Sequence, residues 1–258
     1  MSIKNPFDEV VAGMRSRGFH NHRTEDHSDT VSLGILRDLR RECRQLREDF
    51  DNGKVRHWLN ATSPGGRARK LDLVVAEADG TGNSPDMRRV RICLENKSVI
   101  TAHRNRTNRF DDLDDVRKVL YPLKPDAILV ATVLVGVAER VLNVPDRVKP
   151  FAQDFETRVL PRLSSGDAGL WKEFPHAVSK NRPGDAERTV KKFRELPVRP
   201  PGMTHIEAYD WVLLVPVFVD NVNAPFVARE NNLGIDVDKE YQAMLASTSK
   251  AYFARWHL

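Results

Sequence analysis

Cysteine is scarce in this sequence of 258 residues, which contains only Cys43 and Cys93. Two cysteines are too few for a disulfide framework, and they show no spacing typical of a zinc site. Long apolar runs are also missing, because the most apolar stretch, residues 127–138, is too short to cross a membrane. The first residues lack the apolar core of a secretion signal. These absences argue against a secreted disulfide scaffold or a membrane-bound protein and predict a protein of the reducing cytoplasm.

Several sequence signatures of enzymes and repeat proteins are absent too. The chain contains no internal repeat, no low-complexity segment, no glycine-rich phosphate loop, no serine-triad motif and no paired-cysteine zinc pattern. Its hydrophobic content of 40% and mean hydropathy of −0.49 are typical of a globular protein. A chain of this length can bury one large core, and nothing in it requires two full domains.

The net charge of +5 is unevenly distributed along the chain. Residues 67–109 contain ten Lys or Arg and only five Asp or Glu, so this one segment holds an excess equal to that of the whole chain. A basic field suits a polyanion such as nucleic acid better than a small neutral substrate. The alternative is a basic face that is merely solvated.

Two strand-like runs lie inside this basic segment. Residues 70–75 are apolar except for Lys70 and Asp72, and residues 90–97 form a second run that ends in Glu95-Asn96-Lys97. A carboxylate within an apolar strand is costly unless a metal or a partner compensates it. Successive side chains of a strand alternate between its faces. Alternation places Val90, Ile92 and Leu94 on one face, and Arg91, Cys93, Glu95 and Lys97 on the other.

Two carboxylates and an amine at the end of such a hairpin resemble the PD-(D/E)xK nuclease superfamily, which includes many restriction endonucleases. The resemblance covers about residues 30–140, although Leu71 replaces the proline that the family has before its Asp. It implies a Mg²⁺ site, which Mn²⁺ could also fill, with Asp72, Glu95 and the main-chain carbonyl of Asn96 as ligands. Lys97 would orient or help deprotonate the attacking water. The alternative is a surface hairpin whose charges are only solvated.

The family often takes one further acidic residue from the helix that precedes the Asp strand. Apolar residues at spacings of one, three and four predict such a helix over residues 30–50. We expect Glu42 to be the additional catalytic carboxylate, with Asp38, one turn earlier, as the substitute. The alternative is a surface glutamate that pairs with a neighbouring arginine.

The segment that follows Lys97 is basic and contains no acidic residue up to Arg109. Members of the family often have DNA-contacting groups just beyond the Glu-x-Lys strand. We therefore expect Arg104, Arg106 and Arg109 to bind phosphates, together with His103. For His103, an exposed histidine without a particular role is the alternative.

The remaining pattern predicts an α/β fold with a restriction-endonuclease-like αβββαβ core, in which helices flank a central mixed sheet. Pro216 indicates that the last strand is an edge strand or contains a bulge. A polar N-terminal arm (residues 1–29) should precede a single domain (30–258), whose core covers about 30–140 and 205–258 and whose helical insertion covers about 148–203. Within it we expect strands at 55–59, 127–135 and 209–220, and helices at 111–121, 151–160, 186–196 and 238–256.

These features together predict a Mg²⁺-dependent endonuclease that cuts double-stranded DNA in restriction or another defence role. Cutting both strands at a symmetric site would favour a twofold homodimer. A non-catalytic nucleic-acid-binding protein on the same fold is the first alternative. A structural or interaction protein with a mixed sheet is the second, and it would require Asp72, Glu95 and Lys97 to diverge in space.

Overall fold

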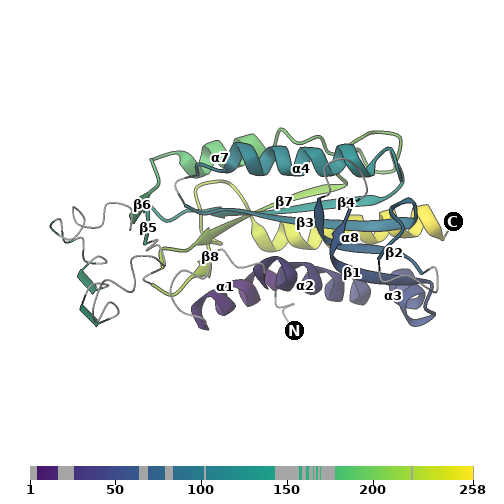
Figure 1. Ribbon diagram of the computed structural model, residues 1–258, viewed down its shortest axis with the longest axis horizontal. Coiled ribbons are helices and arrows are strands. Elements are labelled where there is room, and N and C mark those ends of the chain that lie inside the picture. Colours follow the sequence, from purple (N-terminus) through teal and green to yellow (C-terminus); the bar gives the residue numbers. More distant parts are fainter. Residues whose placement is uncertain are drawn as a thin grey trace.

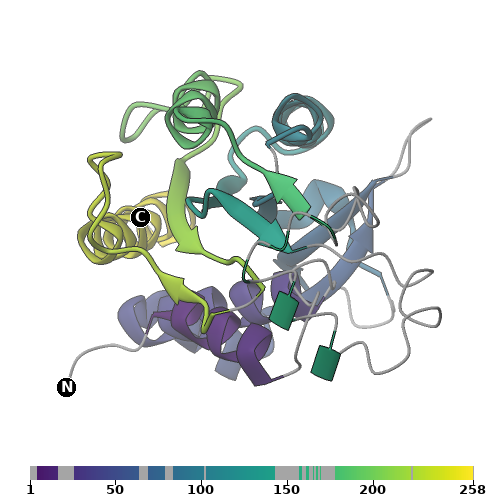
Figure 2. The same ribbon diagram turned by 90° about the vertical axis from the view of Figure 1, so that its left-hand side faces the viewer.

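The computed structural model has three layers, with helices on both faces of a central sheet (Figures 1 and 2). It describes residues 5–16, 26–63, 69–78, 84–101, 103–142, 178–221 and 223–257, and a few residues between 157 and 169. Because helices pack on both faces of a mixed sheet, the chain is an α/β protein. None of the helices in these ranges is both long enough and apolar enough to span a membrane.

The central sheet has six strands in the order β1-β2-β3-β4-β7-β8. β1, β2 and β3 are an antiparallel meander, β3, β4 and β7 run parallel, and β8 is antiparallel to β7. A separate pair, β5 and β6, lies beyond the end of β4 (Figure 1). The strands are β1 (Val55–Thr62), β2 (Lys70–Glu77), β3 (Val90–Val99), β4 (Ile128–Gly136), β5 (Arg140–Leu142), β6 (Val178–Lys180), β7 (Trp211–Phe218) and β8 (Phe226–Val227).

Among the described residues, six α-helices cover the two faces of this sheet. α2 and α8 pack on one face together with α1 and α3, and α4 and α7 cover the other (Figure 2). The helices are α1 (Pro6–Ser16), α2 (Asp26–Glu42), α3 (Arg44–Asp51), α4 (Arg106–Leu120), α7 (Asp185–Phe193) and α8 (Val237–Trp256).

β4 is the centre of the core, because all nine of its residues are buried. A parallel strand with helices on both faces has no solvated side, so its sequence is an almost continuous apolar run. This explains why the longest apolar stretch of the chain is a strand and not a helix. Between β3 and β4 the chain crosses the sheet through α4, as parallel neighbours require. The order helix, three strands, helix, strand therefore extends from α3 to β4.

The predicted N-terminal arm is partly wrong, because α1 belongs to the folded body. Phe7, Val10 and Met14 of α1 are buried in the same core as the sheet residues. The single helix expected over residues 30–50 is instead two helices, α2 and α3. Cys43 separates them in an extended conformation, with φ −103° and ψ 101°.

The C-terminal half agrees with the sequence pattern wherever it is described. α7, β7 and α8 lie where two helices and a strand were expected, whereas most of the helix expected at residues 151–160 lies outside the described residues. Pro216 is on β7, whose only neighbour on the outer side is the two-residue β8. β7 is therefore an edge strand over most of its length, which tolerates a residue without an N–H group.

One face of β3 departs from strict alternation. The consecutive β2 residues Val75 and Ala76 pair with Ile92 and Val90 of β3. Arg91, between these two β3 residues, is therefore an extra residue in a β-bulge. Glu95 keeps the face that alternation predicts. Arg91 points to the opposite face, where its Nη1 donates to Asp49 of α3 over 2.7 Å. The expectation that Arg91 shares a face with Glu95 is therefore wrong, because one inserted residue reverses the alternation before it.

The end of β4 passes very close to the end of β3. A Cβ atom built on Gly136 would lie 2.6 Å from the carbonyl oxygen and 2.7 Å from the Cα of Ile100. Contacts this short with backbone atoms cannot be relieved by a side-chain rotation. Glycine at this position therefore permits the approach of the chain that leads from β3 to α4.

Replacing Gly136 with alanine should thus destabilise the protein by about 1–3 kcal/mol, because the backbone of Ile100 has to move. Gly13→Ala is a matched control, since a Cβ there would meet nothing within 4 Å and alanine favours its helix. Urea unfolding followed by circular dichroism would measure both changes. Equal stability of the two variants would contradict the close approach.

Candidate active site

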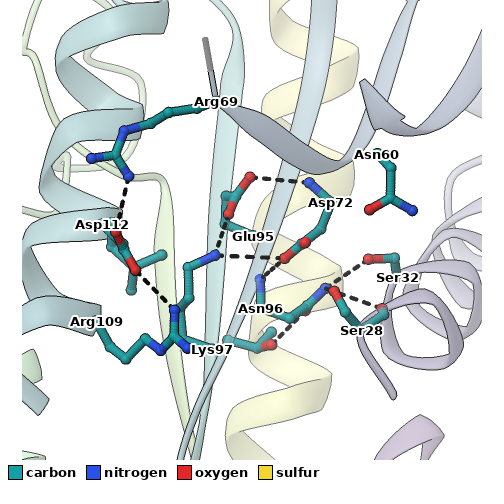
Figure 3. Close-up of polar contacts among 12 residues, drawn as sticks. Ser28, Ser32, Asn60, Arg69, Asp72, Glu95, Asn96, Lys97, Arg109 and Asp112 are labelled. Carbon is teal, nitrogen blue, oxygen red and sulfur yellow. Dashed lines mark hydrogen bonds and ion pairs between the residues drawn. The ribbon is translucent and has the colours of Figure 1, made fainter. Parts of the chain in front are cut away.

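Asp72, Glu95 and Lys97 lie together where β2 and β3 diverge (Figure 3). The Lys97 Nζ atom is 2.7 Å from Glu95 Oε2 and 3.8 Å from Asp72 Oδ2. Asp72 comes from β2, and the other two residues come from β3. The structure therefore brings together the three side chains that the sequence singled out, and they do not diverge in space.

The backbone around these residues explains why the carboxylates meet. The β2–β3 ladder starts at Leu73 and Leu94, just inside the two acidic residues. Beyond it, Asp72 Oδ2 accepts a hydrogen bond of 2.7 Å from the backbone N–H of Asn96. The backbone N–H of Asp72 in turn donates to Glu95 Oε1 over 3.1 Å. Side-chain oxygens thus replace carbonyl groups as partners of the strand backbone at the site where the strands separate.

The Glu95 carboxyl group is almost completely buried, with 1% of the residue exposed. Burial raises its pKa to about 7; the Lys97 ammonium opposes this shift, and the negative charge of Asp72 adds to it. A carboxyl group of this kind changes its charge near neutral pH. A divalent cation close to it would stabilise the charged form.

Lys97 supplies the positive charge that balances the two carboxylates. Burial by itself would lower the pKa of its ammonium group, but the nearby Glu95 and Asp72 more than offset this effect. The pKa of Lys97 is therefore raised above its ordinary value. At neutral pH the lysine is charged and is a hydrogen-bond donor only.

The donor set suits a hard cation such as Mg²⁺, which prefers carboxylate, carbonyl and water oxygens. Because the N–H of Asn96 points towards Asp72, its carbonyl group also faces the β2 side, as in any strand. Two carboxylates and one carbonyl could thus ligate one ion, and waters would fill the remaining positions. Among the described residues no group of three or more Asp, Glu, His or Cys side chains is arranged to hold a metal. A site here would depend on the main-chain oxygen and on water.

A cleft of about 510 Å³ opens beside these groups. Asp72 and Lys97 lie in its wall, together with the first turn of α2 on one side and Asn105 and Arg109 of the α4 region on the other. The deeper wall is apolar and includes Val31 and Leu134. The cleft therefore gives a substrate access to the charged cluster from solvent.

A second ion-pair network holds α4 beside the cluster. Asp112 of α4 accepts hydrogen bonds of 3.0 Å from both Arg69 and Arg109 (Figure 3). Arg69 also pairs with Asp115 one turn further along the helix. Because Arg69 directly precedes β2, these pairs connect the start of the Asp72 strand to the helix that follows Lys97.

The basic residues expected to bind DNA occupy different environments. Arg104 and Arg109 are exposed, and Arg109 lies in the wall of the cleft. The Arg106 side chain is half-buried and lies 3.7 Å from Asp185 of α7. Arg104 and Arg109 are therefore the two arginines of this segment that are best placed to meet a phosphate.

His103 is a correction to the predicted phosphate contacts. The residue is 3% exposed, and its two ring nitrogens lie 2.6 Å from Thr189 Oγ1 and 3.0 Å from the Gly136 carbonyl oxygen. Burial lowers the pKa of its imidazole, which favours the neutral form. His103 connects α7 and β4 to the start of α4, and both of its ring nitrogens already have protein partners.

Glu42 is a second correction, because it lies at the wrong end of α2. The part of α2 that touches the site contains Ser28 and Ser32, and Glu42 lies ten residues further, about 15 Å along the helix. Its side chain is exposed and pairs with Arg41 over 3.6 Å. The substitute Asp38 is fully buried and accepts a hydrogen bond of 2.7 Å from Tyr241. Neither residue joins the cluster.

Three hydroxyl residues that the sequence analysis did not single out do contact the site. Asn96 Nδ2 lies 2.6 Å from Ser32 Oγ and 3.3 Å from Ser28 Oγ, and Asn96 Oδ1 accepts a hydrogen bond of 2.6 Å from Thr132 Oγ1. Alternation in β3 contained a signal for this arrangement, since the residue between Glu95 and Lys97 must face the opposite side of the sheet. The pattern could not name its partners, which come from α2 and β4.

Comparison of this chain with protein-family models, with curated proteins and with solved structures finds no match. The candidate site is thus described by its own geometry: two carboxylates and a lysine that share one charge cluster at the divergence of two strands.

Proposed function

We propose that this protein is a metal-dependent nuclease that hydrolyses phosphodiester bonds in DNA. The observation that carries the proposal is the convergence of Asp72, Glu95 and Lys97 in one cluster, with the lysine amine 2.7 Å from Glu95. Two hard oxygen ligands lie beside an ammonium group, and Asp72 and Lys97 line a cleft, which suits the attack of water on a phosphate. The wall of the same cleft contains Arg109, which can bind a polyanion.

In this mechanism each residue of the cluster has a separate task. Asp72 and Glu95, with the carbonyl of Asn96, would hold Mg²⁺, which when bound neutralises phosphate charge and makes water more acidic. The Lys97 ammonium would leave Glu95, orient the attacking water and stabilise the negative charge that builds up on the phosphate. Arg109, and Arg104 nearby, would hold the flanking phosphates without reading the base sequence.

The order of elements supports the same proposal. A helix, three antiparallel strands, a crossover helix and a parallel strand follow one another as in the αβββαβ core that the resemblance implies. A restriction or other defence role, and a twofold dimer that cuts both strands, are the corresponding proposals for the biology. Binding of DNA without cleavage would instead favour the non-catalytic alternative.

The first prediction from the proposed function separates catalysis from metal binding. Lys97→Ala removes a charge beside both carboxylates, so cleavage of plasmid DNA in Mg²⁺ should fall by about 100-fold or more. The affinity for Ca²⁺, measured by calorimetry well above pH 7 where Glu95 stays ionised without the lysine, should rise because a competing cation has been removed. Asp72→Ala should abolish both DNA cleavage and Ca²⁺ binding.

Lys239→Ala is the control for this experiment, since Lys239 is exposed on α8 and its loss should change neither cleavage nor Ca²⁺ binding. Equal cleavage by the wild type and by both site variants would rule out this active site.

The second prediction concerns pH. Because the pKa of Glu95 is raised to about 7, a proton competes with the metal below that pH. The dissociation constant for Ca²⁺ should therefore fall about tenfold for each unit of pH increase up to pH 7 and then become constant. Glu95→Gln, which cannot be deprotonated, should bind weakly and lose this dependence. A pH-independent affinity in the wild-type protein would contradict the role of Glu95 as a ligand.

The third prediction tests the exposed arginines. Replacing both Arg104 and Arg109 with alanine should weaken binding to every DNA duplex in Ca²⁺. The slope of the logarithm of the binding constant against the logarithm of the salt concentration should become shallower by about 0.9 per lost phosphate contact. Arg88 and Arg89 are an exposed pair at the opposite end of β3, and their replacement is the matched control. A loss restricted to one DNA sequence would show instead that Arg104 and Arg109 read bases.

A further inference from the structure

The side chain of Asn96 is the centre of a partly buried hydrogen-bond network that faces away from the charged cluster. Its amide nitrogen donates to Ser32 Oγ over 2.6 Å and lies 3.3 Å from both the carbonyl oxygen and the hydroxyl of Ser28. Its amide oxygen accepts a hydrogen bond of 2.6 Å from Thr132. Ser32 and Thr132 are 0% and 1% exposed, whereas Asn96 and Ser28 are half-buried and line the cleft. Both ends of the amide group are therefore fixed (Figure 3).

The backbone of the same residue holds the catalytic carboxylate. The N–H of Asn96 donates to Asp72 Oδ2 over 2.7 Å, and the carbonyl of Asn96 faces the same divergence of strands. β2 no longer pairs with β3 at this point, so the sheet ladder does not hold Asp72 and Asn96 in register. The β3–β4 ladder still holds this stretch of β3, because Asn96 lies opposite Thr132, but the Asn96 N–H points to the β2 side. The side-chain network on the other face therefore adds a further attachment for the Asn96 peptide.

We propose that Asn96 is a positioning residue whose amide, held by Ser28, Ser32 and Thr132, fixes its own peptide so that Asp72 and the Asn96 carbonyl are aimed at one point. This positioning role rests on the proposed function, because the direction of Asp72 and of the Asn96 carbonyl group matters only if a metal is bound between them. Outer groups that orient metal ligands in this way typically change metal affinity or activity by about 10–100-fold.

The network also joins three elements that surround the cleft. Ser28 lies in the wall of the cleft, on the first turn of α2, and Thr132 lies opposite Asn96 on β4. A substrate that displaces the first turn of α2 would thus act on the Asn96 amide directly. This connection makes α2 part of the machinery that places the carboxylate, although Asp38 and Glu42 of this helix take no part.

A pair of matched variants tests the proposal. Thr132→Val and Thr189→Val each delete a buried hydroxyl with a hydrogen bond of 2.6 Å, to Asn96 and to His103 respectively. Both should lower the midpoint of urea unfolding by a similar amount. Only Thr132→Val should increase the hydrogen-exchange rate of the Asn96 backbone N–H by more than its loss of global stability explains. Only this variant should weaken Ca²⁺ binding, by about tenfold. Ser32→Ala should act like Thr132→Val.

The exchange measurement requires no metal, so it decides the positioning role by itself. If Asn96 exchanged at the same rate in Thr132→Val and Thr189→Val, after correction for stability, Asn96 would not be a positioning residue. A wild-type protein that binds no divalent cation and cuts no DNA would overturn the proposed nuclease function. In that case faster exchange in Thr132→Val alone would still establish that the network fixes the Asn96 peptide.

Discussion

The parallel pairing of β3 with β4 is the interaction on which the rest of the structure depends. It extends over eight residue pairs, from Ile92–Ile128 to Val99–Val135, and β4 is buried along its whole length. Because parallel neighbours require a crossover, this pairing places α4 against one face of the sheet. It also carries β3 beyond the point where β2 leaves it. The divergence that contains the charged cluster exists only because β3 is held on its other side.

Charge balance decides what can remain at that divergence. Glu95 is buried beside Asp72, and two carboxylates this close would repel each other without the ammonium of Lys97. The lysine therefore balances the charge of the carboxylates when no cation is bound, and the same group is available for catalysis when one is. Burial raises the pKa of Glu95 although Lys97 opposes this shift, so stabilisation of the charged carboxylate is incomplete. An added divalent cation would complete it, which connects the electrostatics of the fold to the proposed chemistry.

The surroundings of the cluster differ between its α2 side and its α4 side. Towards α2, the amide of Asn96 is bound by the buried hydroxyl groups of Ser32 and Thr132. Towards α4, Asp112 holds Arg69 and Arg109 at the edge of an open cleft. Hydrogen-bonded ligand groups on one side and charged groups on the other suit the proposed function, in which the site would hold a metal and release a polyanion.

The sequence by itself determined the features that depend on local periodicity. Apolar runs identified β4, β7 and α8, and alternation placed Glu95 and Lys97 on one face of a strand. A lone carboxylate in an apolar strand also indicated Asp72, since burying it without a partner costs free energy. These inferences need only residues that are close together in the chain.

Only the tertiary structure decided which distant groups became partners. His103 looks like a basic-segment residue, yet Thr189 and Gly136 bind both of its nitrogens in the core. Glu42 follows the helix pattern, but the opposite end of α2 meets the site, because a break at Cys43 and the packing of α1 set where that helix lies. The bulge at Arg91 and the hydroxyl partners of Asn96 likewise come from other elements. Hydrogen bonds between residues far apart in sequence leave no periodic trace, so they could be found only in the folded chain.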